Sequence, residues 1–249
     1  MRFKVILNYT PAFFLTLILL IFWEIIVRIN AISSYILPAP TDIVQALIIN
    51  QDVILIHTWQ TLLETSIGLL IAIILGLGIA ICLDMSSRVR KTVYPLLVTS
   101  QTIPMIALAP LLLIWFGFDL LPKVVIVVLS CFFPIVVATS DGFAKIDSEL
   151  IKLFKSMNAS YWQELWMVRF PGTLPQFFSG LKIAATYSVT AAIVGEYVGA
   201  YQGLGIYMQQ MAHAHAIAAV FAIIFVITVL TILLFLLVKG IEKVIIKWV

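Results

Sequence analysis

The segment FAKIDSELIKLFKSMNASYWQELWMVRFPGTLP, residues 143–175, decides how this chain is interpreted. It is polar, basic and rich in helix-forming residues, and long apolar segments precede and follow it. Ordinary connections between neighbouring helices take only a few residues. Residues 145–175 therefore predict a structured cytoplasmic loop. Such a loop indicates a membrane protein that is driven by a soluble partner.

The composition of the whole chain places it in a lipid bilayer. Of its 249 residues, 63% are hydrophobic and only 11% are charged, and its mean hydropathy is +1.14. A soluble domain carries about 25% charged residues, so this chain has too few to cover a surface in water. We predict an all-α polytopic membrane protein that forms a single domain over residues 1–249.

Six apolar segments are long enough to cross the hydrocarbon, which takes about 20 helical residues. The predicted spans are 10–29, 60–83, 96–117, 122–141, 177–199 and 217–239. We interpret the first as a retained span, because no small-residue cleavage site follows it. Pro104 and Pro110 are expected to break the third span, and Pro134 to interrupt the fourth. Interrupted helices tend to line cavities.

The basic residues predict which span ends face the cytoplasm, because Lys and Arg concentrate in cytoplasmic loops. With the N-terminus inside, all of the 15 Lys and Arg except Arg28 and Lys123 fall on the cytoplasmic side, Arg2 and Lys4 among them. Both termini and the loop 145–175 are therefore expected inside. The net charge of +3 needs no nucleic acid to explain it.

Local signals predict two short helices within the loop. Asp147 or Ser148 can cap the first, and Asn158 can adopt the left-handed conformation that ends it. Ser160 opens the second, because Gln163 three residues later completes a capping-box pattern. Pro171 and Pro175 are expected to bar simple continuation into the fifth span. The periodicity alone fits two interpretations equally well: a docking element, and an amphipathic hairpin that only anchors the fold.

The second half of the loop resembles a known sequence pattern. Asn158-Ala159-Ser160-x-Trp162-Gln163 is similar to the Gly-Ala-Ser-x-Trp-Gln of ABC-importer permeases, the membrane subunits of binding-protein-dependent transporters. Phe170-Pro171, Leu174-Pro175 and Gly180-Leu181-Lys182 resemble the steps that follow it. The chain departs from the family in having Lys152-Leu153-Phe154 in place of Glu-Ala-Ala and Asn158 in place of Gly. Because Asn is the usual substitute for Gly at a left-handed position, the turn is expected to survive.

Further motifs resemble the nitrate, sulfonate and taurine branch of this family. In chain order they are Leu37-Pro38-Ala39-Pro40-Thr41, Gln101-Thr102-Ile103-Pro104, Ala107-Leu108-Ala109-Pro110-Leu111, Trp115-Phe116-Gly117, and Gly195-Glu196 with Gly203-Leu204-Gly205. Within the branch, the region from Phe170 to Met208 is most similar to permeases for pyrimidine precursors of thiamine, such as hydroxymethylpyrimidine. A sulfonate, taurine or nitrate importer is the alternative.

The resemblance implies a six-helix permease with the type I ABC importer fold, in the cytoplasmic membrane of a prokaryote. It implies a second permease subunit, expected to be identical, two ATPase subunits and an external solute-binding protein or lipoprotein. The chain has no Gly-x-x-x-x-Gly-Lys-Ser/Thr loop. ATP and Mg²⁺ are therefore expected on the ATPase, and the chain is expected to be no enzyme and to bind no cofactor. The residues expected to couple to the ATPase are Leu150, Leu153, Phe154, Met157, Asn158, Ala159, Ser160, Tyr161 and Trp162.

Polar residues at membrane depth are candidates for the translocation pathway, since a charge there is costly. The candidates are Gln101, Thr102, Pro104, Glu64 and Glu196. Glu196 can face the pathway or hydrogen-bond to the backbone of the Gly-rich loop that follows it. Glu64 can be interfacial, ion-paired or part of the pathway.

Other function classes find less support in the sequence. An intramembrane enzyme needs a nucleophile and a base at depth, but His57, His213 and His215 all fall near span ends. His213 and His215 lack the further ligands of a metal site, so none is expected. A secondary transporter or channel would leave the long loop unexplained. The energy-coupling subunit of a vitamin transporter would lack the Gln-Thr-Ile-Pro and Gly-Leu-Gly motifs.

Overall fold

The computed structural model describes residues 2–247, and in the first helix it describes the side chains of Pro11 and of residues from Phe14 onward. The side chains of Arg2 and Lys4, which entered the topology prediction, lie outside this range. The helices are α1 (Arg2–Ile29), α2 (Pro40–Ile49), α3 (Gln51–Met85), α4 (Ser87–Ser100), α5 (Met105–Phe116), α6 (Leu120–Ala144), α7 (Ser148–Ser156), α8 (Tyr161–Glu164), the π-helical turn η1 (Leu165–Arg169), α9 (Phe170–Gly199), α10 (Leu204–His213) and α11 (Ile217–Ile245).

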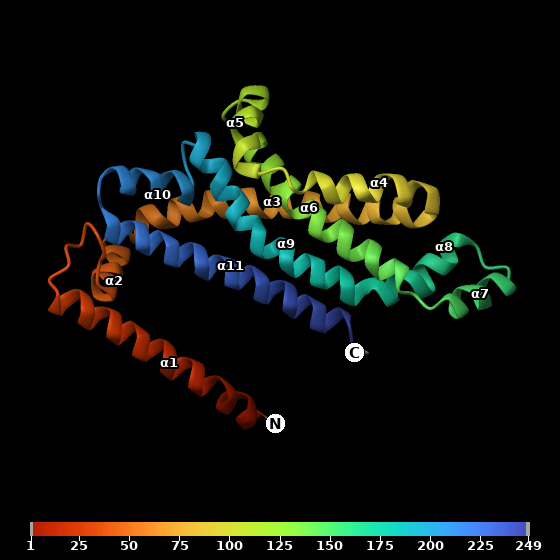
Figure 1. Ribbon diagram of the computed structural model, residues 1–249, viewed down its shortest axis with the longest axis horizontal. Coiled ribbons are helices and arrows are strands. Elements are labelled where there is room, and N and C mark those ends of the chain that lie inside the picture. The colour runs from red at the N-terminus through yellow and green to blue at the C-terminus, as the bar shows by residue number, and fades with distance from the viewer. Residues whose placement is uncertain (1, 248–249) are drawn as a thin grey trace.

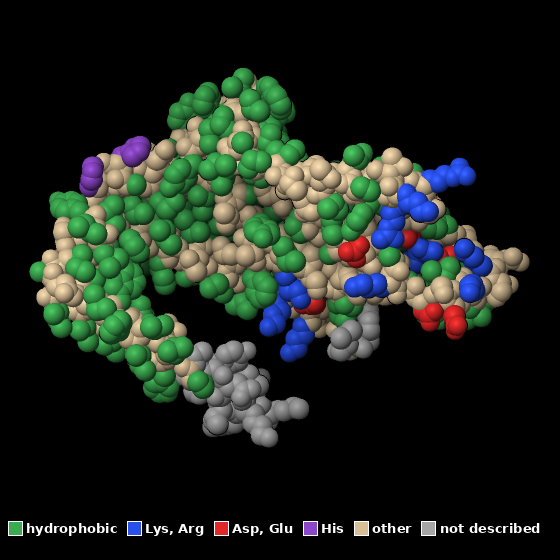
Figure 2. All heavy atoms as spheres, in the orientation of Figure 1, with side chains coloured by type: hydrophobic (Ala, Val, Ile, Leu, Met, Phe, Trp, Pro, Cys, Tyr) green, Lys and Arg blue, Asp and Glu red, His purple; other side chains and the backbone are tan. Residues whose placement is uncertain are grey.

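The helices form an elongated bundle with two distinct ends (Figure 1). We call the end that carries α7 and α8 the loop end, and the end that carries α2 and α10 the far end. On the face drawn in Figure 2, Lys and Arg side chains gather towards the loop end, whereas His side chains lie at the far end. The bundle is therefore polarised along its long axis.

Four helical runs of the described chain are long and apolar enough to cross a membrane: α3, α6, α11 and the continuous run from Tyr161 to Gly199. The segment predicted as the third span, 96–117, is not one straight helix. It falls in α4 and α5, which are bent by 95° at the break before Pro104. Counted as one broken span, this pair gives a fifth crossing. The remaining predicted span, 10–29, lies in α1.

Three expectations about prolines are wrong. Pro110 lies inside α5 and Pro134 inside α6, and neither ends its helix. Pro171 and Pro175 do not bar continuation, because α9 begins at Phe170 and contains both. Pro171 occupies the first turn of α9, where a missing N–H is tolerated. The preceding π-helical turn η1 has already shifted the hydrogen-bonding pattern at that point.

The centre of the bundle is formed by α6 packed between α3 and α9, and small residues set the spacing. A Cβ added at Gly68 or Gly76 of α3 would lie 2.5 Å or 2.7 Å from side-chain carbons of α6. A Cβ at Gly180 of α9 would lie 2.6 Å from the carbonyl oxygen of Pro134. Close backbone approach of this kind is how helices associate where lipid removes the hydrophobic driving force.

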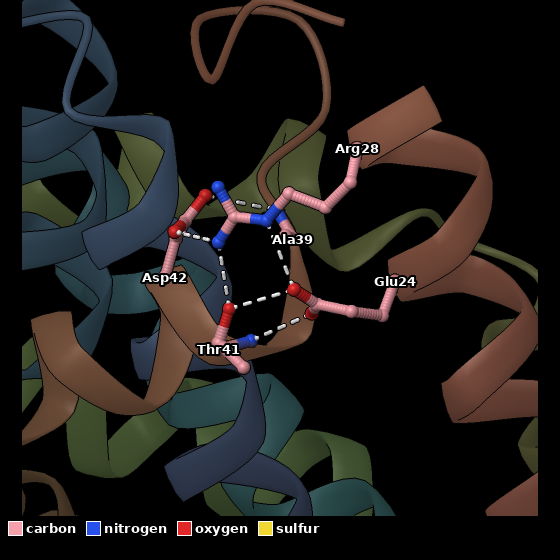
Figure 3. Close-up of polar contacts among 5 residues, drawn as sticks. All are labelled: Glu24, Arg28, Ala39, Thr41 and Asp42. Atoms are coloured by element: carbon pink, nitrogen blue, oxygen red, sulfur yellow. Dashed lines mark hydrogen bonds and ion pairs between the residues drawn. The ribbon is translucent and has the colours of Figure 1, made fainter. Parts of the chain in front are cut away.

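The first helix is joined to the bundle at the far end through a polar network (Figure 3). Arg28 donates to Glu24 Oε1 at 3.0 Å and to Thr41 Oγ1 and Asp42 Oδ1 at 2.8 Å each. Glu24 Oε2 accepts the N–H of Thr41 at 3.1 Å, and Asp42 accepts the N–H of Ala39 at 3.2 Å. The carboxylates thus satisfy free amides at the start of α2. The Glu24–Arg28 ion pair of α1 therefore extends to α2.

Candidate functional site

A cavity of about 440 Å³ opens at the break between α4 and α5. The break, α6 and α9 supply its walls, lined by Gln101, Thr102, Ile103, Pro104, Met105, Ser130, Phe133, Pro134, Tyr187, Thr190, Ala191 and Val194. α4 ends at Ser100, and Pro104 is the N-cap of α5 with an extended backbone conformation, so residues 101–104 form the break. Three of the residues predicted for the pathway, Gln101, Thr102 and Pro104, are therefore brought to one cavity.

The lining of this cavity combines apolar side chains with uncharged polar ones, and none of its described residues is acidic or basic. Thr102 donates its hydroxyl proton to the carbonyl of Thr99 at 2.7 Å, which leaves its oxygen lone pairs for an acceptor role. Gln101 offers both a donor and an acceptor. Phe133 and Tyr187 add aromatic rings to the walls. Such a lining suits a neutral, planar solute that both donates and accepts hydrogen bonds.

The two acidic candidates do not line this cavity. Glu64 and Glu196 are both completely buried, in the middle of α3 and near the end of α9. The Oε2 atom of Glu196 accepts the N–H of Gly205 at 2.5 Å. Of the two interpretations given for Glu196, the structure therefore shows the hydrogen bond to the backbone of the Gly-rich loop.

Glu196 belongs to a polar clamp that holds the N-terminus of α10. Three successive backbone N–H groups, of Gly203, Leu204 and Gly205, are each accepted by a side chain from a long helix. His57 Nδ1 accepts the first at 3.0 Å and Thr61 Oγ1 the second at 2.9 Å. Free amides at a helix start need such acceptors when water is excluded. We call this group the far-end clamp.

The two glycines of the clamp are required because parts of α9 lie too close to their backbone for a side chain. Gly203 has a φ of +132°, which L-residues rarely adopt. A Cβ there would lie 2.2 Å from the Glu196 carboxyl carbon, and one at Gly205 would lie 2.7 Å from the carbonyl oxygen of Ile193. The Gly203-Leu204-Gly205 motif is thus explained by the carboxylate that packs against it. Sequence reasoning missed the acceptors His57 and Thr61, although their spacing of four residues places them on one face of α3.

At the loop end, the predicted caps of the loop are present. Asp147 accepts the N–H of Glu149 at 2.8 Å, and Asn158 has a φ of +56°, in the left-handed region. Ser160 and Gln163 form the expected reciprocal capping box, with bonds of 3.3 Å and 2.8 Å. The second helix of the loop, however, is not a separate element, because α8 continues through η1 into α9.

The continuous run from α8 to α9 is fixed to the end of α3 by a second polar cluster. Arg169 makes two bonds to Asp84, at 2.8 Å and 2.9 Å, and also contacts the Glu164 carboxylate. Tyr161 donates its hydroxyl to Asp84 at 3.1 Å, and Leu165 beside it is fully buried. Tyr161 thus faces the bundle, where it does not offer the outward contact expected of it. No local sequence pattern marks Asp84 as the partner of Arg169 and Tyr161.

The exposed side of the loop carries apolar side chains. Leu150, Leu153 and Trp162 are each about half exposed, Met157 is 71% exposed and Phe154 is half-buried. Lys152 and Lys155 lie exposed among them. A surface of this kind on a structured loop is typical of a docking site for another protein.

Comparison with known proteins establishes the class. The family model described as "Binding-protein-dependent transport system inner membrane component" matches residues 68–248, and the chain belongs to this family. The chain is 40% identical to the formylaminopyrimidine transport permease protein of Halalkalibacterium halodurans, over 93% of each chain. It is 27% identical to a putative aliphatic sulfonates transport permease protein of Bacillus subtilis, over 93% of this chain and 84% of that one.

A solved structure shows the same fold. An inward-facing structure of the MetNI methionine ABC transporter matches with a TM-score of 0.69 and 18% identity, over 78% of this chain and 97% of that chain. The protein is therefore a multi-pass permease component of an ABC importer with the type I fold, and it is not an enzyme. As such a component it works with ATPase and solute-binding partners.

Proposed function

We propose that this permease imports a small substituted pyrimidine that an external binding protein delivers. The observation that carries the proposal is the 40% identity to a formylaminopyrimidine permease across almost the whole chain, against 27% to a sulfonate permease. The uncharged cavity supports the same choice. A sulfonate or nitrate anion would gain from a Lys or Arg, whereas a pyrimidine needs amide and hydroxyl partners and an aromatic wall.

The proposed assembly has two identical copies of this chain, two ATPase subunits and one solute-binding protein. The loop end faces the cytoplasm, and both termini lie inside. The gathering of Lys and Arg towards the loop end supports this orientation (Figure 2). ATP and Mg²⁺ bind to the ATPase subunits, and this chain needs no cofactor of its own.

In the proposed mechanism, the exposed side of α7 and α8 docks on the ATPase and transmits its closure. Leu150, Leu153, Met157 and Trp162 provide the contact, with Phe154 behind them. Asn158, Ala159 and Ser160 hold the angle between the two helices, and Tyr161 holds the second helix on α3. Because α8 is continuous with α9, movement of the loop displaces α9 as a lever, and α9 forms one wall of the cavity.

The proposal is tested by purifying the transporter from its native membrane and identifying the proteins that accompany it. An ATPase and a solute-binding protein that binds an aminopyrimidine are the expected result. The reconstituted complex should then take up labelled formylaminopyrimidine or hydroxymethylpyrimidine only with ATP, and Gln101→Ala should reduce uptake. Uptake of an alkanesulfonate, taurine or nitrate in preference to every pyrimidine would overturn the substrate. Solute movement without ATP would point to a channel or secondary transporter.

A further inference from the structure

A cluster of ionisable side chains lies buried where α3, α6 and α9 meet, beside the far-end clamp. Glu64 on α3 and Glu196 on α9 are 0% exposed, and Lys123 on α6 is 4% exposed. The ammonium nitrogen of Lys123 lies 3.7 Å from Oε1 of Glu64. If all three groups were ionised, two carboxylates and one ammonium would leave one uncompensated negative charge at membrane depth. Such a charge is strongly disfavoured.

The neighbouring groups do not compensate that charge. Among the described residues, the polar partners of the two carboxyls besides Lys123 are Gln60 and Thr61 on α3 and the N–H of Gly205 on α10. All three are neutral donors. His57 of the clamp uses its Nδ1 as an acceptor for the Gly203 N–H, so this ring nitrogen carries no proton.

One of the four carboxyl oxygens of Glu64 and Glu196 lacks a hydrogen-bond donor. Glu196 accepts from Thr61 at 2.6 Å and from Gly205 at 2.5 Å, one bond on each oxygen. Glu64 Oε1 accepts from Gln60 at 2.8 Å, but its Oε2 is buried without a hydrogen-bond partner. Thr61, which bonds to Glu196, lies three residues before Glu64 on the same face of α3, so the two carboxyl groups belong to one buried cluster. Two ionised carboxylates are acceptors only, so a direct bond between them requires a proton on one of them.

We propose that the Glu64–Glu196 pair holds a single proton between its carboxyl groups, and that this shared proton joins α3 to α9 beside the N-terminus of α10. The cluster then contains one carboxylic acid, one carboxylate and one ammonium, and its net charge is zero. The proton supplies the donor that the Glu64 side chain lacks. Other pairs of buried carboxyl groups avoid two neighbouring negative charges in the same way, by sharing a proton.

A small cavity at the far end lies next to the partners of this pair. A polar cavity of about 170 Å³ is lined by Gln60 and Lys123, together with Asp119, Tyr201 and Gln202. Gln60 and Lys123 are the two residues that contact Glu64 Oε1. The proton is taken up from water through this cavity, in a step that involves no oxidation or reduction. At alkaline pH its loss would leave two carboxylates in contact, which would separate α3 from α9 and loosen the far-end clamp.

Infrared spectroscopy of the purified transporter in lipid nanodiscs tests the proposal. The carbonyl stretch of a protonated carboxylic acid is expected at neutral pH, and Glu64→Gln and Glu196→Gln should each abolish it. Glu242→Gln is the matched control, because Glu242 is ion-paired to Lys182 at 2.9 Å and lies away from the pair. Absence of the band, or a band that neither pair variant changes, would overturn the proposal. Loss of only half the band in each variant would show two protons and overturn it as well.

A second measurement keeps the proposal testable if a pair variant fails to insert. The folded protein binds one proton more than the unfolded chain at neutral and alkaline pH, so stability falls as pH rises. Thermal melting of the unaltered transporter should therefore drop from neutral to alkaline pH, and Glu242→Gln should show the same slope. Glu64→Gln or Glu196→Gln, where either folds, should flatten it. A melting temperature independent of pH in the unaltered protein would contradict the shared proton.

Discussion

Two polar clusters hold neighbouring helices against α3 with different chemistry, one at its last turn and one nearer its middle. At the loop end, Asp84, Glu164 and Arg169 form a cluster of two carboxylates and one cation, and at the far end Glu64, Glu196 and Lys123 form another. The Arg169 guanidinium reaches both carboxylates at once, because it presents five N–H donors in a planar fork. The Lys123 ammonium reaches only Glu64, at 3.7 Å.

The difference shows how one cation can satisfy the hydrogen bonds of two carboxylates at once. Arginine at the loop end satisfies both carboxylates directly, so that cluster needs no further donor. Lys123 contacts only Glu64. Glu196 is hydrogen-bonded by Thr61 and Gly205 instead, and Oε2 of Glu64 has no partner. Backbone amides and one shared proton complete the far-end cluster. Each of the following changes tests or refines this contrast.

The largest effect is expected for Arg169→Met. It leaves two buried carboxylates without a cation, and breaking a buried pair of this kind costs about 3–5 kcal/mol. Residues 148–164 should lose protection in hydrogen exchange, and ATP hydrolysis should no longer drive uptake. Arg169→Lys should recover only part of both, because it cannot bind bidentately. Full coupling in Arg169→Met would contradict the role given to this cluster.

The next effect is expected for Gly203→Ala, which places a Cβ against the Glu196 carboxyl group at a backbone angle suited to glycine. We expect a loss of about 1–3 kcal/mol, seen as a lower melting temperature in detergent. Gly78→Ala is the control, because a Cβ there meets nothing within 4 Å. Equal melting of both variants would show that α10 is not held closely by Glu196.

Lys123→Met sharpens the contrast between the two cations. Without the ammonium, both Glu64 and Glu196 must be protonated for the cluster to be neutral. The folded state then binds two protons more than the unfolded one, so the fall of stability with rising pH should become steeper than in the unaltered protein. Melting curves from acidic to alkaline pH measure this slope. An unchanged slope would mean that Lys123 does not compensate the pair.

The smallest effect on stability is expected for Met157→Asp, on the exposed side of the loop outside both clusters. Because this side chain is 71% exposed, the free energy of unfolding should change by no more than about 0.5 kcal/mol. The melting temperature should therefore stay nearly the same. Uptake should nevertheless be lost while the ATPase still hydrolyses ATP, and Met157→Leu should retain uptake. Normal uptake in Met157→Asp would remove this residue from the docking surface.

Local signals in the sequence predicted the caps of the loop helices, but not that the second helix continues into α9. The caps at Asp147 and Ser160 and the left-handed turn at Asn158 were predicted and are present, because each involves partners within five residues. The prolines were predicted less well. Pro134 and Pro175 lie within continuous helices. Packing of neighbouring helices stabilises those segments more than the missing hydrogen bond destabilises them.

The sequence by itself determined that this is a membrane protein, that four of the predicted crossing segments lie in long apolar helices, and where the basic loop lies. These properties depend only on the types of residue along a continuous segment. The segment length can be compared directly with the bilayer thickness, and its apolar pattern with the helical repeat. The tertiary structure alone decided which charges are paired. Arg169 bonds to Asp84, which is 85 residues away in the sequence, and Thr61 bonds to Glu196, which is 135 residues away. No local pattern encodes such a pairing, because only the packing of α3, α6 and α9 brings these side chains together and excludes water from them.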